Sequence, residues 1–365
     1  MIQPGKTLSL ILGSYLGQRQ GGAELQAHYL ERKALQQRWH THYCFLSDES
    51  NYENNSEVIL HPIIIKKIWS KLGDIKYPYA GCLLKLLKRI QPDVIYQRGG
   101  LSFTGVCALY AKKSKCRFIF HIAHDRDLQV VSTPWHKPYL IPEVKLMQYG
   151  IRNADTIISQ TNFQANQLVE NYGRTAIVIP NAHPVPPNCK KSLDKIIILW
   201  IANWKPLKRP EIFVRLASKI MNKSKIRLIM LGRNDNYKEL IAKGKANGIE
   251  VMGEIPNDQV NELLAEAHIL VNTSKQEGFS NTFIQAWMRR VPVVSLRVDP
   301  DDILHRKKIG YCSGNFENLV QDTQKLITDN GLREAMGNRA REYAINHFSL
   351  ENMTKILKII ENSSI

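Results

Sequence analysis

The 365-residue chain is longer than the roughly 100–200 residues of a single compact core, so we expect two domains. Hydrophobic and charged shares of 44% and 23% exclude disordered and fibrous classes. With 50 Lys and Arg against 33 Asp and Glu, the net charge is +17, which favours anionic partners such as nucleotide phosphates, acidic lipids or nucleic acid.

The six cysteines are scattered, with no C-x-x-C pair and no Cys/His spacing of zinc-site type. This distribution is typical of a reduced, cytoplasmic compartment. The apolar run Leu8–Leu12 is shorter than the apolar part of a signal peptide, and we interpret it as a buried strand. No stretch approaches the roughly 20 apolar residues of a spanning helix, so any membrane association should be peripheral.

In the first half, short aliphatic runs alternate with longer helical patterns, which predicts parallel βαβ units in an α/β fold. A helix should cover Gly22–Gln37, because apolar side chains recur there with helical spacing. The predicted strands are Leu8–Leu12, His42–Leu46, Val94–Gln97, Arg117–Ile122, Thr156–Ser159 and Ala176–Ile179.

The second half repeats this alternation. Its predicted strands are Lys195–Ile201, Arg227–Leu231, Glu250–Met252, Ile269–Asn272 and Pro292–Leu296. Between the halves, His183–Lys191 is rich in proline and lacks periodicity, as a linker does. We therefore predict Rossmann-like domains over residues 1–183 and 184–345, followed by a helical segment, 346–365, whose apolar face must pack on one of them.

A basic stretch of the first half, from Lys66 to Arg117, is opposed only by Asp74 and Asp93. Its basic residues are Lys66, Lys67, Lys71, Lys76, Lys85, Lys88, Arg89, Arg98, Lys112, Lys113, Lys115 and Arg117. Apolar side chains between Ile68 and Leu87 make part of this stretch a basic amphipathic pattern. Such a pattern lies either on an anionic membrane surface or on a solvated helix face, and both interpretations stay open.

The most informative segment, SKQEGFSNTFIQA over Ser274–Ala286, follows the buried strand that ends at Asn272. Ligands bind at the carboxyl edge of parallel strands, where such a loop enters a helix. Gly278 allows close backbone approach, and Glu277 offers a carboxylate there. The alternative for Glu277 is a solvent-exposed loop carboxylate.

The same segment should begin a helix, because Ser280, Asn281 and Thr282 are good N-cap residues. Thr282 and Gln285 also have capping-box spacing. The backbone N–H groups at a helix start, together with the helix dipole, favour an anion.

This pattern resembles the E-x7-E region of glycosyltransferase family 4, a retaining family with the GT-B fold. The resemblance implies that Glu277 contacts the transferred sugar and that Gln285 holds the nucleotide ribose. Gln285 departs from the pattern, because an amide can bond a ribose hydroxyl but loses the charge-assisted part. The other donor-binding residues implied here are Gly278, Phe279, Ser280, Asn281 and Thr282.

A second segment, Leu199–Pro210, runs from a strand through a loop into a helix. It resembles the family's G-R-L-x-x-x-K-G donor-phosphate site, with Lys208 on the family's lysine. Asn203 stands where arginine is usual, which removes one phosphate contact unless Lys205 reaches the same anion. Arg233 is a further candidate for this site. Basic clusters at helix starts are common, so this segment supports the resemblance only in combination with Glu277.

In the first half, Gly21 and Gly22 open a predicted helix and resemble the family's glycine-rich loop that faces the donor diphosphate; a structural turn is the alternative. HIAHD follows a predicted strand and resembles the family's cleft histidine, which we align with His124, followed by Asp125 as a further candidate. His121 should point into the core. A structural histidine is the alternative for His124.

The resemblance covers nearly the whole chain and implies two Rossmann-like domains facing across a cleft, with a C-terminal helix that crosses back to the N-terminal domain. Asn181 matches a structural interdomain turn of the family. The aspartates of 299–302 superficially suggest a metal-binding D-x-D, but their place after a later strand argues against it. We expect no metal and no other cofactor.

The implied activity is that of a metal-independent, hexosyl-type transferase of EC class 2.4. It would move a sugar, with retention, from a nucleoside diphosphate sugar, expected to be UDP-linked, to a saccharide or lipid-linked acceptor hydroxyl in polysaccharide or glycolipid biosynthesis. Lys208 would stabilise the departing diphosphate, and Glu277 and His124 would lie beside the sugar. The alternatives are an inactive sugar-nucleotide-binding or scaffolding homologue and, from charge alone, a nucleic-acid-binding protein.

Overall fold

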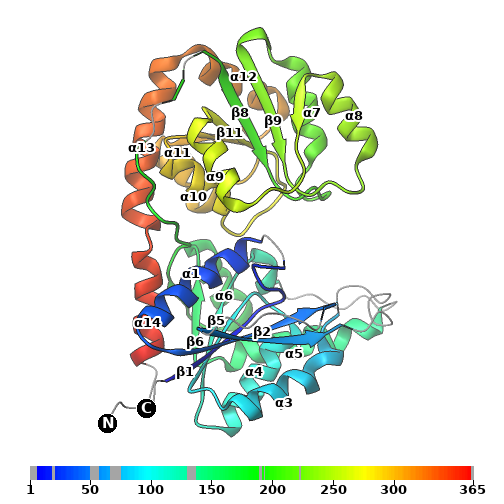
Figure 1. Ribbon diagram of the computed structural model, residues 1–365, viewed down its shortest axis with the longest axis vertical. Helices are drawn as coiled ribbons and strands as arrows, with labels where there is room; N and C mark the ends of the chain where they lie inside the picture. The colour runs from blue at the N-terminus through cyan, green and yellow to red at the C-terminus, as the bar shows by residue number, and fades with distance from the viewer. Residues whose placement is uncertain are drawn as a thin grey trace. The chain divides into compact units, whose positions relative to one another are not determined.

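A computed structural model describes residues 6–18, 21–49, 57–65, 75–129, 137–188, 191–192, 194–221 and 223–362. The chain divides into two compact units. The first comprises Met1–Ala182 together with Leu350–Ile365, and the second comprises His183–Ser349. Each unit is a parallel sheet with helices on both faces, which confirms the predicted α/β class (Figure 1).

Within the described residues, the sheet of the first unit has seven parallel strands in the order β3-β2-β1-β4-β5-β6-β7. They are β1 Thr7–Ile11, β2 His40–Ser47, β3 Val58–Ile64, β4 Val94–Arg98, β5 Arg117–His121, β6 Thr156–Ser159 and β7 Ile177–Val178. The helices are α1 Gly22–Gln36, α3 Ala80–Ile90, α4 Ser102–Lys113, α5 Ile141–Asn153, α6 Asn162–Tyr172 and α14 Glu351–Asn362, with the 3-10 turns η1 Tyr77–Tyr79, η2 Asp125–Leu128 and η3 Pro138–Leu140.

Two apolar layers cover this sheet. Helices α3, α4 and α5 pack on one face, where Leu83, Leu87 and Phe118 are fully buried. Helices α1 and α14 cover the other face (Figure 1), and α14 contributes the fully buried Leu357 and Ile360 to that layer. The last helix of the chain therefore completes the core of the first unit, as the predicted fold class requires.

Six parallel strands form the sheet of the second unit, as far as the chain is described, in the order β10-β9-β8-β11-β12-β13. They are β8 Ile196–Ile201, β9 Ile226–Leu231, β10 Ile249–Val251, β11 Ile269–Asn272, β12 Val293–Ser295 and β13 Gly310–Cys312. The helices are α7 Pro210–Lys219, α8 Lys238–Ala246, α9 Asn257–Glu266, α10 Asn281–Met288, α11 Ile303–Lys307, α12 Phe316–Thr328 and α13 Asn330–Phe348, with 3-10 turns η4 Lys223–Lys225 and η5 Pro300–Asp302.

All eleven predicted strands are present, with ends that differ by up to two residues. Two edge strands, β3 and β13, were not predicted. β3 contains Pro62, which lowers the strand signal but is tolerated at an edge. β13 is only three residues long and begins with Gly310, so it carries no usable periodicity.

Both sheets have a point where the strand order reverses, between β1 and β4 in the first and between β8 and β11 in the second. The loops at the carboxyl ends of two such strands leave in opposite directions and form a natural binding crevice. In the second unit these loops are the ones that follow Ile201 and Asn272.

The basic amphipathic pattern of the first half is only partly available at the surface. Its segment 66–74 lies outside the described residues. The leucines of α3 face the core, whereas Lys85, Lys88 and Arg89 are exposed. Arg98 is buried, so the basic residues do not form one surface stripe. None of the helices in the described ranges is long and apolar enough to span a membrane.

A buried histidine holds the start of β8. The His268 Nδ1 accepts a hydrogen bond from the Ile197 N–H at 3.1 Å, and its Nε2 lies 2.9 Å from the Ser192 carbonyl oxygen. The neutral ring with its proton on Nε2 satisfies both contacts. Burial, with the nearby charges of Lys191 and Arg333, lowers the pKa of His268 to about 4.

The pH dependence of unfolding should report this histidine. Its folded pKa of about 4 lies below the unfolded value of about 6.5, so its contribution is complete above pH 6.5 and is lost as pH falls toward 4. Between pH 7 and pH 5, the free energy of unfolding of the wild type, measured in urea, should fall by about 2 kcal/mol more than that of His268→Gln.

His305→Gln is the matched control, because the His305 side chain is 83% exposed. This control should keep the wild-type pH dependence. An unchanged pH dependence in His268→Gln would contradict the assignment.

Candidate functional site

The two predicted donor segments meet at the reversal point of the second sheet. The residues 202–209 follow β8, and the residues 273–280 follow β11, which pairs directly with β8. Buried aliphatic strands bring both loops to the same edge of the sheet, and each loop then enters a helix, α7 or α10. The polar residues of two distant sequence segments are thereby placed side by side.

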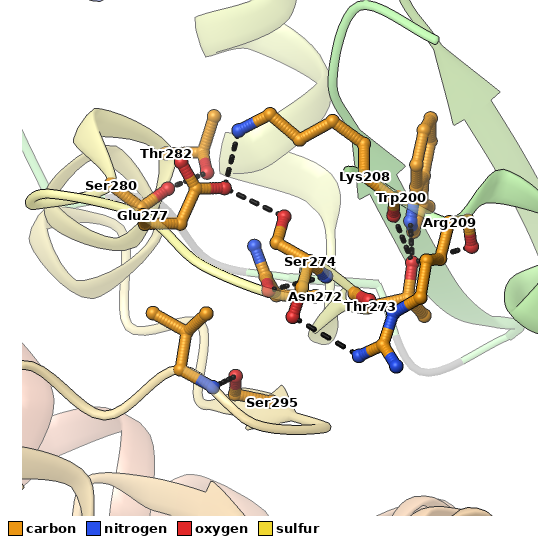
Figure 2. Close-up of polar contacts among 11 residues, drawn as sticks. Trp200, Lys208, Arg209, Asn272, Thr273, Ser274, Glu277, Ser280, Thr282 and Ser295 are labelled. Carbon is orange, nitrogen blue, oxygen red and sulfur yellow. Dashed lines mark hydrogen bonds and ion pairs between the residues drawn. The ribbon is translucent and has the colours of Figure 1, made fainter. Parts of the chain in front are cut away.

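Lys208 and Glu277 form an ion pair across these loops. The Lys208 ammonium donates to Glu277 Oε1, and the two side chains are 23% and 12% exposed. The Ser274 hydroxyl donates to the same oxygen at 2.6 Å (Figure 2). Glu277 is therefore not the exposed loop carboxylate of the alternative interpretation, because a cation and a hydroxyl both hold it.

Thr273 joins the two loops from beneath. Its fully buried hydroxyl accepts a hydrogen bond from Trp200 Nε1 at 2.8 Å and donates to the Lys208 carbonyl oxygen at 2.7 Å (Figure 2). One side chain thus connects β8, the loop that carries Lys208 and the loop that carries Glu277. Sequence analysis did not identify Thr273 or Ser274, and their only signal was their place directly after a buried strand.

Arg209 adopts an uncommon backbone conformation at the N-cap of α7, with φ 49° and ψ 57°. For a residue with a side chain this conformation costs about 1–2 kcal/mol. The guanidinium offsets the cost, since Nε donates to the Thr273 carbonyl oxygen at 2.7 Å and a terminal nitrogen donates to the Ser274 carbonyl oxygen at 3.2 Å. Arg209 therefore turns away from Lys208 toward the neighbouring backbone (Figure 2).

Helix α10 begins after Ser280, one of the predicted N-cap residues, but without the predicted side-chain cap. Ser280 is its N-cap and makes no side-chain cap bond, and the Ser280 and Thr282 hydroxyls bond each other at 2.8 Å. The predicted capping box between Thr282 and Gln285 is wrong, because the Gln285 amide is engaged elsewhere. Phe279 packs in the core against Trp287 and Phe348. Only the Phe279 backbone could face a donor.

Gln285 is buried, and its side-chain nitrogen donates to Asn257 Oδ1 at 2.9 Å and to Asn261 Oδ1 at 3.2 Å. Both asparagines belong to α9. The two N–H donors of the amide are thus satisfied within the protein, which leaves its carbonyl oxygen as the group able to accept from a ligand. The role of Gln285 in donor binding stays a prediction.

Asn203 and Arg233 lie together. The Asn203 side-chain oxygen accepts from the Arg233 N–H at 3.2 Å, and the Trp204 N–H donates to the Arg233 carbonyl oxygen at 2.8 Å. The Arg233 side chain is 40% exposed and makes one long contact, 4.0 Å, with Asp235. Lys205 is exposed on the adjacent loop. The structure thus places the backbone of Arg233 beside Asn203, which stands where the family pattern has an arginine.

In the first unit, a carboxylate covers the predicted glycine loop. Gly21 is the N-cap of α1 and Gly22 its first residue. The Glu24 carboxylate folds back so far that a Cβ on Gly21 would clash with it, and the Ser14 hydroxyl donates to the same carboxylate. In this structure a side chain of the protein occupies the position where the sequence predicts an anionic ligand.

His124 is held in place by its own loop. The Arg126 N–H donates to His124 Nδ1 at 3.2 Å, so the neutral ring carries its proton on Nε2. Asp127, which the sequence analysis missed, accepts from the N–H groups of Ala123 and His124, both at 2.9 Å. The Asp125 carboxylate accepts from Gln164 on α6 at 2.9 Å, so it serves the loop rather than an open surface.

His121 points into the core, as predicted, and is fully buried. Its Nδ1 lies 2.7 Å from the Tyr96 hydroxyl and 3.0 Å from an Arg98 guanidinium nitrogen. Burial and the Arg98 charge lower the pKa of His121 well below its usual value, so it remains neutral. Arg98 also donates to the Asn181 side chain, which gives this residue the structural role predicted for it.

In the described part of the chain, no three His, Cys, Asp or Glu side chains gather around one point. The Asp299 carboxylate instead accepts the backbone N–H of Leu304 at 2.8 Å and of His305 at 3.3 Å, so it holds the start of α11. The cysteines in the same ranges are free thiols.

Taken together, the second unit offers a cation and a carboxylate on adjoining loops, beside the start of a helix. Such an arrangement can neutralise a polyanion and orient a neutral polyol next to it. The first unit adds His124 and Glu24 at the carboxyl edge of its own sheet.

Two family models match the chain. The model of Glycosyltransferase Family 4 matches residues 20–184, and the model of Glycosyl transferases group 1 matches residues 195–329. Among curated relatives, N-acetyl-alpha-D-glucosaminyl L-malate synthase of Bacillus anthracis is 27% identical over 43% of this chain and 42% of its own length. The poly(ribitol-phosphate) alpha-N-acetylglucosaminyltransferase of Staphylococcus aureus is 22% identical over 85% of this chain and 63% of its own.

The chain therefore spans about half the length of these curated relatives. Among solved structures, Anabaena HepE in complex with UDP-glucose matches with a TM-score of 0.75 and 14% identity, over 98% of this chain and 99% of that one. This likeness confirms the predicted GT-B fold.

The Thr273 hydroxyl should contribute more to the free energy of unfolding than the hydroxyl of an exposed threonine. Thr273→Val keeps the shape but leaves Trp200 Nε1 and the Lys208 carbonyl oxygen without their partner, which should cost about 2–3 kcal/mol in urea unfolding. Thr328→Val is the control, because this exposed threonine bonds only backbone oxygens of its own helix. Its effect should stay within about 0.5 kcal/mol. Equal stability of the two variants would contradict the role of Thr273.

Proposed function

Because this chain belongs to glycosyltransferase family 4, we propose that it transfers a sugar from a nucleoside diphosphate sugar to an acceptor hydroxyl, with retention of anomeric configuration. The observation that carries the proposal is the pairing of Lys208 with Glu277 at the reversal point of the second sheet. This is the place where a parallel α/β sheet binds its ligand, and the pair combines the two charges that the reaction needs.

Lys208 would neutralise the donor diphosphate as the bond to the sugar breaks. Negative charge develops on the leaving phosphate, so a preorganised ammonium stabilises the transition state more than the ground state. The start of α10 adds the positive end of a helix dipole on the same side. These groups supply the positive potential that a metal would otherwise provide, and on that ground we propose a metal-independent reaction.

Glu277 would orient the transferred sugar. Its carboxylate is paired with Lys208 and Ser274, and a bound donor would compete for these contacts. The diphosphate then competes for the ammonium, and the released carboxylate can accept hydrogen bonds from sugar hydroxyls. After the exchange the ammonium would be paired with the diphosphate and the carboxylate would accept hydrogen bonds, so neither charge would be left without a partner.

The remaining donor contacts are assigned by position. Arg233 would supply the second phosphate contact in place of the arginine that Asn203 replaces, with Lys205 as an additional cation on the adjacent loop. Gln285 would accept a ribose hydroxyl through its carbonyl oxygen. We propose a UDP-linked hexose-type donor, since Anabaena HepE, which shares the fold, was solved with UDP-glucose.

In the first unit we propose that His124 lies beside the transferred sugar and that Gly21 and Gly22 face the diphosphate. The Glu24 carboxylate repels a diphosphate while it covers Gly21, so it would have to move or take part in acceptor recognition. The acceptor is proposed to be a saccharide or a lipid-linked saccharide of a polysaccharide or glycolipid pathway. The Staphylococcus aureus relative, named for poly(ribitol-phosphate), supports an acceptor of this general kind.

A lipid-linked acceptor would be reached at an anionic membrane surface. Helix α3 suits contact with such a surface only by charge, because its leucines are packed in the core and its outer face carries Lys85, Lys88 and Arg89. Electrostatic attraction to anionic lipid is worth about 1 kcal/mol per basic side chain. We therefore propose a salt-sensitive, reversible contact rather than insertion.

Replacement of Glu277 tests the proposed activity. Glu277→Ala should lower sugar transfer, or donor hydrolysis in the absence of an acceptor, by about 100-fold or more, because the sugar loses its orienting carboxylate. Release of UDP, GDP or ADP from the corresponding sugar nucleotides measures the rate, and a thermal-shift screen selects the donor first.

Glu317→Ala is the matched control, since Glu317 is an exposed acid of α12 and belongs to neither of the two loops. This variant should retain wild-type rates, and Glu277→Ala should keep its melting temperature within a few degrees of it. A wild-type rate of sugar transfer or donor hydrolysis in Glu277→Ala would contradict the proposal. The anomeric configuration of the product, read by NMR, decides whether the reaction retains.

The membrane contact has its own test. The double variant Lys85→Ala/Lys88→Ala should bind vesicles containing phosphatidylglycerol about tenfold or more weakly than the wild type at low salt. The control is Lys243→Ala/Lys245→Ala on α8, which removes the same charge from exposed positions of the second unit. Equal losses in both double variants would mean that net charge, and not α3, governs vesicle binding.

A further inference from the structure

We infer that Arg209 is a positioning residue, which holds the Glu277 loop in register with Lys208. The inference rests on the proposed function, because it concerns the same site. In the KPLKRP segment Arg209 follows Lys205 and Lys208, so its position in the sequence suggests a third phosphate-binding cation. Its contacts indicate a different task, since its guanidinium donates to two backbone carbonyl oxygens of the Glu277 loop.

The geometry separates Arg209 from its neighbour. The Lys208 ammonium reaches Glu277 on one side of the Thr273–Ser274 backbone, while the Arg209 guanidinium approaches that backbone from the other side (Figure 2). Arg209 stands at the N-cap of α7 with a positive φ of 49°, a conformation that is uncommon for a residue with a side chain. Two adjacent cations thus serve two different purposes.

The chain of contacts from Arg209 to Glu277 is short. Arg209 binds the carbonyl oxygens of Thr273 and Ser274, and the Ser274 hydroxyl donates to Glu277 Oε1 at 2.6 Å. A planar guanidinium can bind two successive carbonyl oxygens at once, which a lysine ammonium on a flexible stem cannot do with the same fixed geometry. Arg209 therefore restricts the rotation of the segment that presents the Glu277 carboxylate.

Other bonds keep the loops together without Arg209. The Lys275 N–H donates to the Leu207 carbonyl oxygen at 2.8 Å, and the Thr273 hydroxyl donates to the Lys208 carbonyl oxygen at 2.7 Å. Loss of the guanidinium should thus leave the fold intact and loosen only the placement of Glu277. Because a displacement of about 1 Å can cost 100-fold in rate, the effect should appear in catalysis.

The test compares Arg209→Gly and Arg209→Lys with Arg215→Ala. Glycine adopts positive φ without strain, so Arg209→Gly removes the guanidinium and keeps the backbone. Arg215 lies on the same helix, is exposed and has its guanidinium carbon 3.9 Å from the Phe316 ring centroid, so its loss controls for charge. We expect Arg209→Gly to lower kcat about tenfold or more, with Kd for UDP changed less than about twofold.

Two further readouts separate positioning from folding and from donor binding. Millimolar guanidinium should restore part of kcat in Arg209→Gly but not in Arg209→Lys, whose side chain still fills the site. Backbone hydrogen exchange over residues 273–277 should be faster in Arg209→Gly than in Arg215→Ala. A kcat equal to that of Arg215→Ala, or a loss of UDP affinity as large as the loss of kcat, overturns the inference.

The exchange measurement also distinguishes this inference from the proposed function. If the wild type turns over none of the sugar nucleotides, the proposed function fails, and hydrogen exchange alone then decides. Faster exchange at 273–277 in Arg209→Gly supports positioning, and exchange equal to that of Arg215→Ala overturns it. If Arg209→Gly melts far below the wild type, Arg209→Lys replaces it in the comparison. Hydrogen exchange at 273–277 and a kcat equal to those of Arg215→Ala would then overturn the inference.

Discussion

The buried Thr273 hydroxyl is the contact on which the candidate site of the second unit depends. It accepts from Trp200 and donates to the Lys208 carbonyl oxygen, and thereby ties two loops that are more than sixty residues apart in sequence. Because a buried polar group without its partner is costly, each of these bonds excludes alternative loop arrangements. The Lys208–Glu277 pair is a consequence of this restraint, since flexible loops would hold two solvated charges only weakly.

The first unit uses a carboxylate for the same purpose. Asp127 accepts backbone N–H groups from Ala123 and His124, and the Gly100 N–H also contributes. Burial raises the pKa of Asp127, and these hydrogen bonds and the nearby Arg126 oppose that rise. The loops after β4 and β5 are therefore fixed by one side chain, as Thr273 fixes those after β8 and β11. In both units, one polar side chain thus bonds two adjoining loops at the edge of the sheet.

This division explains what the sequence could and could not predict. Aliphatic runs such as Ile269–Asn272 are buried on both faces, so the alternation of strands and helices, and with it the fold, is legible in composition. Lys208 and Glu277 are legible because their residue types and spacing resemble a family pattern. Thr273, Ser274 and Asp127 are not, because a threonine, a serine or an aspartate after a strand is common in any protein. Their importance lies in partners distant along the chain.

The two departures from the family pattern each have a local counterpart in the structure. At position 285 a carboxylate would be buried as a charge, whereas the Gln285 amide is neutral and its two N–H groups meet the oxygens of Asn257 and Asn261. At position 203 the Asn203 oxygen accepts the Arg233 N–H and so fixes the loop that carries another arginine. Both departures are therefore accommodated by hydrogen bonds within the second unit, and neither leaves the loops of the candidate site without their local contacts.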